Sequence, residues 1–113
     1  MSIIGAIGSA ITGSANSTVT AAGTTLATAT ALLSGFNVVS TATSLQGVQL
    51  QVGLIGDAQI VFNNTSAPIT VYPSASTSRI NQIAVGGGHI LGPMTACMYL
   101  YASATQHIGF LSA

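Results

Sequence analysis

The side chains in this chain that could take part in catalysis or metal binding are few and widely spaced. There are two histidines, His89 and His107, one cysteine, Cys97, and one acid, Asp57. Zinc sites need about three or four ligands of these types, and glycoside hydrolysis by paired carboxylates needs a second acid. A Ser–His–Asp triad would depend on Asp57, and no G-x-S-x-G motif supports one. We therefore expect no enzymatic activity, no cofactor and no metal, with a hydrolase that uses either histidine as the alternative.

The two charged residues, Asp57 and Arg79, are candidate interface residues. They could pair with each other, either within one chain or between subunits. A pair buried at an interface would set the register of the subunits more than their affinity. Asp57 follows Gly56, and it is explained equally well as a turn residue.

The composition excludes several classes of function. Charged residues make up 2% of the 113 residues, compared with about 25% in ordinary soluble domains. Binding to nucleic acid requires several Lys and Arg side chains, and a protein of membrane surfaces requires a basic amphipathic face. A single domain with a net charge near zero tends to associate. We therefore expect a homo-oligomer that contacts neither nucleic acid nor membrane.

Residues 1–16 form a distinct N-terminal segment that contains Ile3, Ile4, Ile7 and Ile11. The spacing of Ile3, Ile7 and Ile11 fits one stripe of a helix, but glycines within the segment lower its helix propensity. It lacks the basic start of a secretory signal and the length of a membrane span. We expect a flexible anchoring arm whose isoleucines dock onto a partner, and the alternative is a frayed terminus.

The clearest local pattern in the chain is the segment 58–73, AQIVFNNTSAPITVYP. Ala58–Phe62 and Ile69–Tyr72 consist mainly of apolar, β-branched and aromatic residues that favour strands. The segment between them, from Asn63 to Pro68, is made of turn residues. The pattern predicts a central β-hairpin with an exposed tip at Asn63–Pro68.

Further stretches with strand-like composition follow one another along the chain. Turn signals every 8–12 residues between short strands are typical of an all-β sandwich or barrel. We therefore predict one all-β domain over residues 17–113, an antiparallel β-sandwich or a jelly-roll-like fold. Besides the central pair, its predicted strand regions are 17–42 with a strand at 36–41, 45–52, 79–85, 94–102 and 107–111.

Five motifs, in this order, resemble a small β-domain that recurs in structural proteins of tailed bacteriophages. They are TVTAAGTTLATATAL, FNVVSTA, GVQL, AQIVFNNTSAPITVYP and RINQIAV. The resemblance covers the chain from Thr18 onward. It differs from the usual pattern at Gln51, where relatives often have proline, and in the absence of tryptophan near the end.

This resemblance implies a non-enzymatic building block of a virion. Small size and a neutral, hydroxyl-rich surface favour a capsid decoration (cement) protein on the outer surface of the head. It would sit there as an oligomer, preferably a trimer, with residues 1–16 as the arm that anchors it. Its partner would be the major capsid protein, which it would stabilise in the shell. The alternative is a tail-fibre or receptor-binding module of the same fold, which would bind glycans through Tyr72, Tyr99 or Tyr101.

Overall fold

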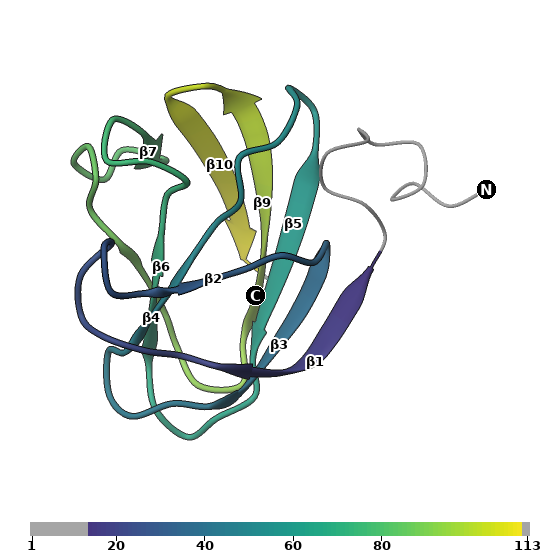
Figure 1. Ribbon diagram of the computed structural model, residues 1–113, viewed down its shortest axis with the longest axis vertical. Coiled ribbons are helices and arrows are strands. Elements are labelled where there is room, and N and C mark those ends of the chain that lie inside the picture. The colour runs from purple at the N-terminus through teal and green to yellow at the C-terminus, as the bar shows by residue number, and fades with distance from the viewer. Residues whose placement is uncertain (1–13, 112–113) are drawn as a thin grey trace.

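The computed structural model describes residues 14–111, and every regular element within this range is a β-strand. The all-β prediction is therefore confirmed. Figure 1 shows the arrangement of the strands. In chain order they are β1 (Ala15–Thr20), β2 (Thr30–Ala31), β3 (Phe36–Thr41), β4 (Gly47–Gln49), β5 (Ala58–Asn63), β6 (Ile69–Tyr72), β7 (Arg79–Ile80), β8 (His89–Leu91), β9 (Ala96–Ser103) and β10 (Gln106–Leu111).

The strands form two sheets that mix parallel and antiparallel pairs. The six-stranded sheet has the order β1-β3-β5-β9-β10-β7, and the four-stranded sheet has the order β2-β4-β6-β8. Pairing is parallel for β1–β3, β3–β5, β2–β4, β4–β6 and β7–β10. It is antiparallel for β5–β9, β9–β10 and β6–β8. The prediction of an antiparallel sandwich or jelly-roll is therefore wrong for the first six strands, which pair with one another only in parallel.

These six strands wind as a short solenoid-like stack in which the chain alternates between the two sheets. β1, β3 and β5 begin at residues 15, 36 and 58, so successive coils start 21 and 22 residues apart. Parallel neighbours need a crossover connection, and here each crossover passes through the opposite sheet. The first coil forms one end of the stack, because β1 and β2 are edge strands of their sheets.

The predicted central hairpin is wrong, although both of its strands exist. β5 pairs with β3 and β9 in the six-stranded sheet, whereas β6 pairs with β4 and β8 in the other sheet. The turn between them therefore forms an arch that carries the chain from one layer to the other. The tip is also only partly exposed, since Asn63 and Thr65 are buried while Asn64 and Ser66 are exposed.

The amide of Asn63 holds this arch together. Its Nδ2 lies within hydrogen-bond distance of the carbonyl oxygens of Ala67, Leu91 and Gly92, at 2.8, 3.1 and 3.1 Å. Its Oδ1 accepts hydrogen bonds from the backbone N–H and the hydroxyl of Thr65, at 3.2 and 2.7 Å. A side chain that satisfies these backbone groups replaces the ladder bonds that a hairpin would have formed.

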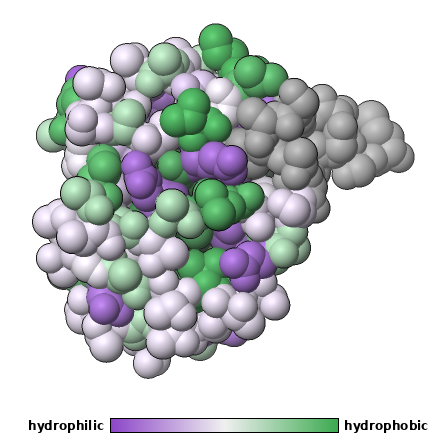
Figure 2. All heavy atoms as spheres, in the orientation of Figure 1, coloured by the Kyte–Doolittle hydropathy of each residue, from purple (hydrophilic) through white to green (hydrophobic). Residues whose placement is uncertain are grey.

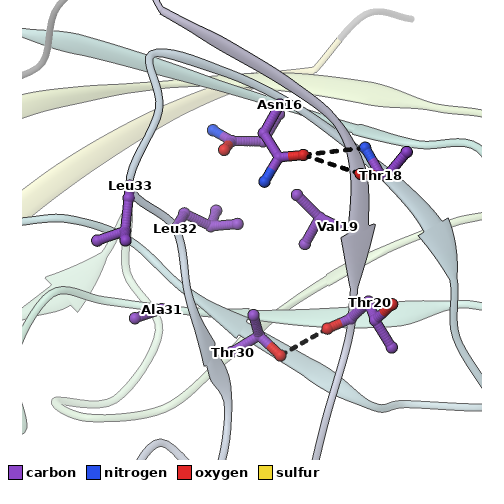
Figure 3. Close-up of a pocket in the computed structure, with 9 residues that line it drawn as sticks. Asn16, Thr18, Val19, Thr20, Thr30, Ala31, Leu32 and Leu33 are labelled. Atoms are coloured by element: carbon purple, nitrogen blue, oxygen red, sulfur yellow. Dashed lines mark hydrogen bonds between the residues drawn. The ribbon is translucent and has the colours of Figure 1, made fainter.

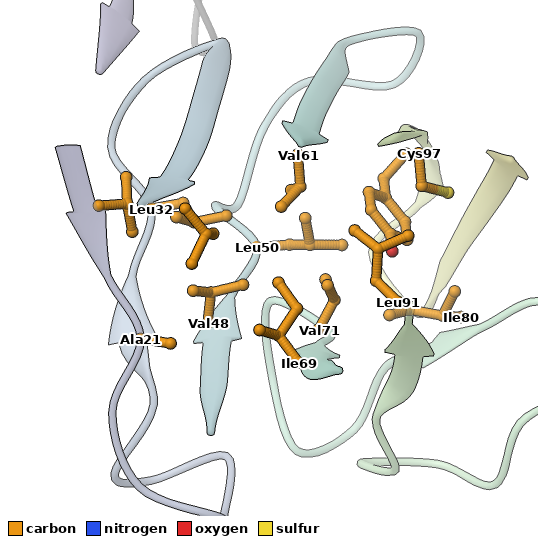
Figure 4. Close-up of a cluster of buried hydrophobic side chains, with 13 residues drawn as sticks. Ala21, Leu32, Val48, Leu50, Val61, Ile69, Val71, Ile80, Leu91 and Cys97 are labelled. Carbon is orange, nitrogen blue, oxygen red and sulfur yellow. The ribbon is translucent and has the colours of Figure 1, made fainter. Parts of the chain in front are cut away.

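The hydrophobic core lies between the two sheets (Figure 4). Each fully buried aliphatic side chain contributes about 1.5–3 kcal/mol relative to exposure, so these contacts supply the main force that holds the layers together. The core residues are Val19, Ala21, Leu32, Val39, Val48, Leu50, Val61, Ile69, Val71, Ile80, Leu91, Cys97 and Tyr99.

The remaining sequence predictions differ from the structure mainly at the ends of strands. The predicted domain boundary at residue 17 falls inside β1. The predicted strand at 45–52 is reduced to β4, and the one at 79–85 ends at Ile80, because Asn81 adopts a φ of 51° that breaks the extended backbone. The strands predicted at 36–41, 94–102 and 107–111 are confirmed as β3, β9 and β10.

Candidate assembly interface

The outer face of the six-stranded sheet is apolar across its four central strands. Side chains alternate between the two faces of a strand, and one face of this sheet packs on the core. In β5, for example, Val61 is buried, whereas Ile60 and Phe62 are only partly buried. We call the outward-facing set the apolar face. Its members are Phe36, Val38, Ile60, Phe62, Ala96, Met98, Leu100, Ile108 and Phe110.

One row of the apolar face crosses the sheet without interruption. Phe36 is paired with Ile60, Ile60 with Met98, and Met98 with Phe110. Phe36, Met98 and Phe110 are 39, 37 and 50% exposed. Neighbouring strands lie about 4.8 Å apart, so this row extends roughly 14 Å across the sheet. Contiguous apolar patches of this kind mark interaction sites on soluble proteins.

The surface in view in Figure 2 has a different character. It is dominated by pale residues of intermediate hydropathy, with scattered hydrophobic residues in green and hydrophilic residues in purple among them. Because only 2% of the residues are charged, such a surface offers little charge repulsion to an approaching copy of the same chain.

Neither charged residue is a member of the apolar face, although Arg79 lies on the same outer side of the sheet, at its β7 edge beside β10. Asp57 is completely buried, and its Oδ2 accepts a hydrogen bond from the backbone N–H of Leu54 at 2.8 Å. This contact confirms its role as a turn residue. Arg79 is partly buried in β7, at the opposite edge of the sheet from β1. The pairing of Asp57 with Arg79 stays a prediction. The other predicted interface residues, Ile3, Ile4, Ile7 and Ile11, lie outside the described residues.

His107 is held against the loop that follows β6. Its Nε2 lies 3.2 Å from the backbone nitrogen and 3.0 Å from the hydroxyl oxygen of Ser74. Because the backbone N–H can only donate, Nε2 accepts and the proton resides on Nδ1. Tyr101 packs edge-on against the ring, at a centroid distance of 5.3 Å. Through these two donors of Ser74 directed at Nε2, His107 connects the loop after β6 to β10.

The burial of His107 makes the stability of the protein depend on pH. Burial lowers the pKa of His107 from its ordinary 6.5 to about 4. Below pH 6.5 the unfolded chain therefore takes up a proton that the folded chain excludes until about pH 4. At 1.36 kcal/mol per pH unit, the free energy of unfolding should fall by up to about 3 kcal/mol across this window. Urea denaturation at several pH values measures the slope.

A His107→Gln variant serves as the control for this pH dependence. Without an ionisable side chain at this position, its free energy of unfolding should vary less steeply between pH 6.5 and 4. If the free energy of unfolding of the variant depended on pH as steeply as that of the unmodified protein, the attribution of this dependence to His107 would be contradicted. His89, whose pKa is also lowered by burial, contributes in the same direction in both proteins.

The other candidate side chains have structural roles as well. The Nδ1 of His89 lies 2.7 Å from the hydroxyl of Tyr99, and the rings are in edge contact at 5.8 Å. Cys97 is buried, as predicted, and burial raises the pKa of its thiol. Among the described residues, no three His, Cys, Asp or Glu side chains gather in a way that could hold a metal ion. In the same range, no helix has the length and hydropathy of a membrane span.

The sequence indicates that the strand at 94–102 is apolar on both sides, but the alternation of its residues does not show which side is exposed. In 94–102 the two sets of alternating residues both contain large apolar side chains, with Met98 and Leu100 on one side and Tyr99 and Tyr101 on the other. A strand with two apolar faces is typical of burial on both sides. In this chain, only one of those faces is covered by the described residues.

Comparison with known proteins identifies no relative of this chain. No protein-family model, no curated protein and no solved structure matches it.

Proposed function

We propose that this chain is a non-enzymatic structural protein of a bacteriophage virion, specifically a capsid decoration protein on the outer surface of the head. The apolar face is the observation that carries the proposal, since none of its nine members is charged and it offers an apolar surface for association. The near absence of charge and the ordered motifs from Thr18 onward also support it.

In this proposal the apolar face packs against further copies of the same chain. A face without charges is self-complementary, because no like charges oppose each other when two copies meet. Homo-oligomer interfaces are more apolar than ordinary protein surface, which agrees with the composition of this face. The oligomer, a trimer in the preferred form, would then contact the major capsid protein through the hydroxyl-rich surface and stabilise the shell.

A tail-fibre module is the second candidate, and the solenoid-like winding favours it. In a solenoid each coil contacts only its neighbouring coils, so the stack can lengthen by the addition of further coils at its ends. The first coil leaves β1 and β2 as edge strands that could receive such a unit.

Quantification of the protein in purified virions, heads and tails distinguishes the candidates. We expect a stoichiometric copy number on heads, and heads that lack the protein should lose their DNA at a lower temperature. Immunogold labelling of tails alone would favour the fibre module, and absence from the particle would contradict both.

A further inference from the structure

A cavity of about 280 Å³ lies between β1 and β2, at the end of the stack that the first coil forms. Figure 3 shows Val19 and Leu32 pointing toward each other across it, and both belong to the hydrophobic core. Leu33, which also lines the cavity, is 76% exposed. An apolar cavity of roughly 150 Å³ is large enough for benzene, so this one has room for a small organic molecule.

The wall of the cavity contains a buried hydrogen-bond acceptor that lacks a donor. Asn37 lines the cavity and is completely buried, and its Nδ2 donates to the carbonyl oxygens of Ser34 and Ile60, at 2.8 and 3.2 Å. Carbonyl oxygens can only accept, so these two contacts fix which side of the amide is the nitrogen. No donor within residues 14–111 reaches the Oδ1 of Asn37. Because an unpaired buried acceptor is unfavourable, this oxygen indicates that a donor is missing from the site.

Asn16 supplies a hydrogen-bond donor beside this acceptor. Asn16 and Asn37 are paired residues of β1 and β3, and neighbouring strands lie about 4.8 Å apart. The Oδ1 of Asn16 accepts hydrogen bonds from the backbone N–H and the hydroxyl of Thr18, at 3.0 and 3.3 Å. A backbone N–H can only donate, so the Nδ2 of Asn16 is on the other side of the amide, where Figure 3 shows it on the side of Leu32. The wall therefore presents an N–H donor next to a carbonyl acceptor.

The chemistry of the cavity favours a neutral ligand with a carboxamide group. None of the described residues that line the cavity is charged, so a charged ligand would lose its hydration without gaining an opposite charge. A secondary carboxamide has an N–H donor and a carbonyl acceptor on neighbouring atoms, so one such group can bond to both asparagines. The remainder of the ligand must be apolar, because Val19 and Leu32 offer no side-chain hydrogen bonds.

We propose that the cavity binds a neutral small molecule that combines a secondary carboxamide with an aliphatic body. The N–H of the ligand donates to the Oδ1 of Asn37, and its carbonyl oxygen accepts from the Nδ2 of Asn16. The aliphatic body lies between Val19 and Leu32 and is removed from water there. None of the described residues that line the cavity is a member of the apolar face, so this site is separate from the proposed interface between copies.

A matched pair of compounds tests the hydrogen bond to Asn37. N-methylcyclohexanecarboxamide and methyl cyclohexanecarboxylate have nearly the same shape, but the ester has an oxygen in place of the N–H. Binding to the purified full-length protein is measured by NMR titration, from the methyl signals of Val19 and Leu32 and the side-chain amide signals of Asn37. We expect the amide to bind at least about ten times more tightly than the ester, because the ester leaves the Oδ1 of Asn37 without a donor.

An Asn16→Asp variant tests the second hydrogen bond, because aspartate keeps an oxygen for Thr18 but has no N–H. Its affinity for the amide should fall at least about five-fold. Asn64→Asp, at an exposed position outside the cavity, adds the same charge and should leave the affinity unchanged. Equal affinities for amide and ester, an unchanged affinity in Asn16→Asp, or methyl signals of Val19 and Leu32 that do not respond to the amide would overturn the proposal. None of these measurements needs a virion or an oligomer, so they are independent of the proposed function.

Discussion

Replacing Met98 by aspartate is expected to dissociate the proposed homo-oligomer into folded monomers. Met98 lies within the exposed row of the apolar face and is 37% exposed, so the free chain can hydrate the new carboxylate. In the assembly the carboxylate would be desolvated and would meet like charges from other copies. Such juxtapositions cost several kcal/mol, so the association constant should fall by more than about 100-fold. Light scattering after size-exclusion chromatography measures the change in mass.

The matched control is Ile90→Asp, the same change of an exposed apolar side chain to a carboxylate. Ile90 is 59% exposed, and it lies in β8 of the four-stranded sheet, away from the apolar face. This variant should keep the mass of the assembled protein. A folded Met98→Asp variant that also keeps that mass would contradict the apolar face as the interface between copies.

Replacing Asn63 by leucine is expected to lower the free energy of unfolding by about 3–5 kcal/mol, because buried backbone groups in and beside the arch would lose hydrogen bonds in the interior. The variant would leave the carbonyl oxygens of Ala67, Leu91 and Gly92 without the Nδ2 donor, and the N–H of Thr65 without its acceptor. Urea denaturation monitored by circular dichroism measures the loss.

The neighbouring residue Asn64 provides the control, since it is exposed and only its backbone N–H is used, in a 3.0 Å hydrogen bond to the carbonyl oxygen of Val39. Asn64→Ala should change the free energy of unfolding by less than about 0.5 kcal/mol. Similar losses in the two variants would show that the amide of Asn63 is not what holds the arch.

The positions of the strands were largely predictable from the sequence, because they follow from local residue preferences. Val, Ile, Phe and Tyr with a period of two mark β3, β5, β6, β9 and β10, and the structure has strands at these places. The shorter strands were less predictable. β2 and β7 have two residues each, and their backbone is extended because of neighbours that are distant in the sequence.

Part of the candidate interface was also visible in the sequence. The composition predicts association, and the strand at 94–102 carries large apolar side chains on both of its faces. Which of those faces lies outward depends on the contacts of Cys97, Tyr99 and Tyr101 with the core and with β10. The apolar face combines side chains from β3, β5, β9 and β10, and no local pattern brings those four strands together.

Local pattern and composition thus suffice for the all-β class and for the main strands, and they predict that a chain with so few charges associates. Strand pairing is decided by the tertiary structure. The sequence pattern of a strand, a polar turn and a second strand is the same in two cases. The two strands can pair with each other, or each can pair with strands of a separate sheet. In this chain the second outcome prevails because β5 and β6 find parallel partners in β3 and β4, while Asn63 satisfies the backbone groups of the arch. Those partners lie about 20 residues earlier in the chain, beyond the reach of any local preference.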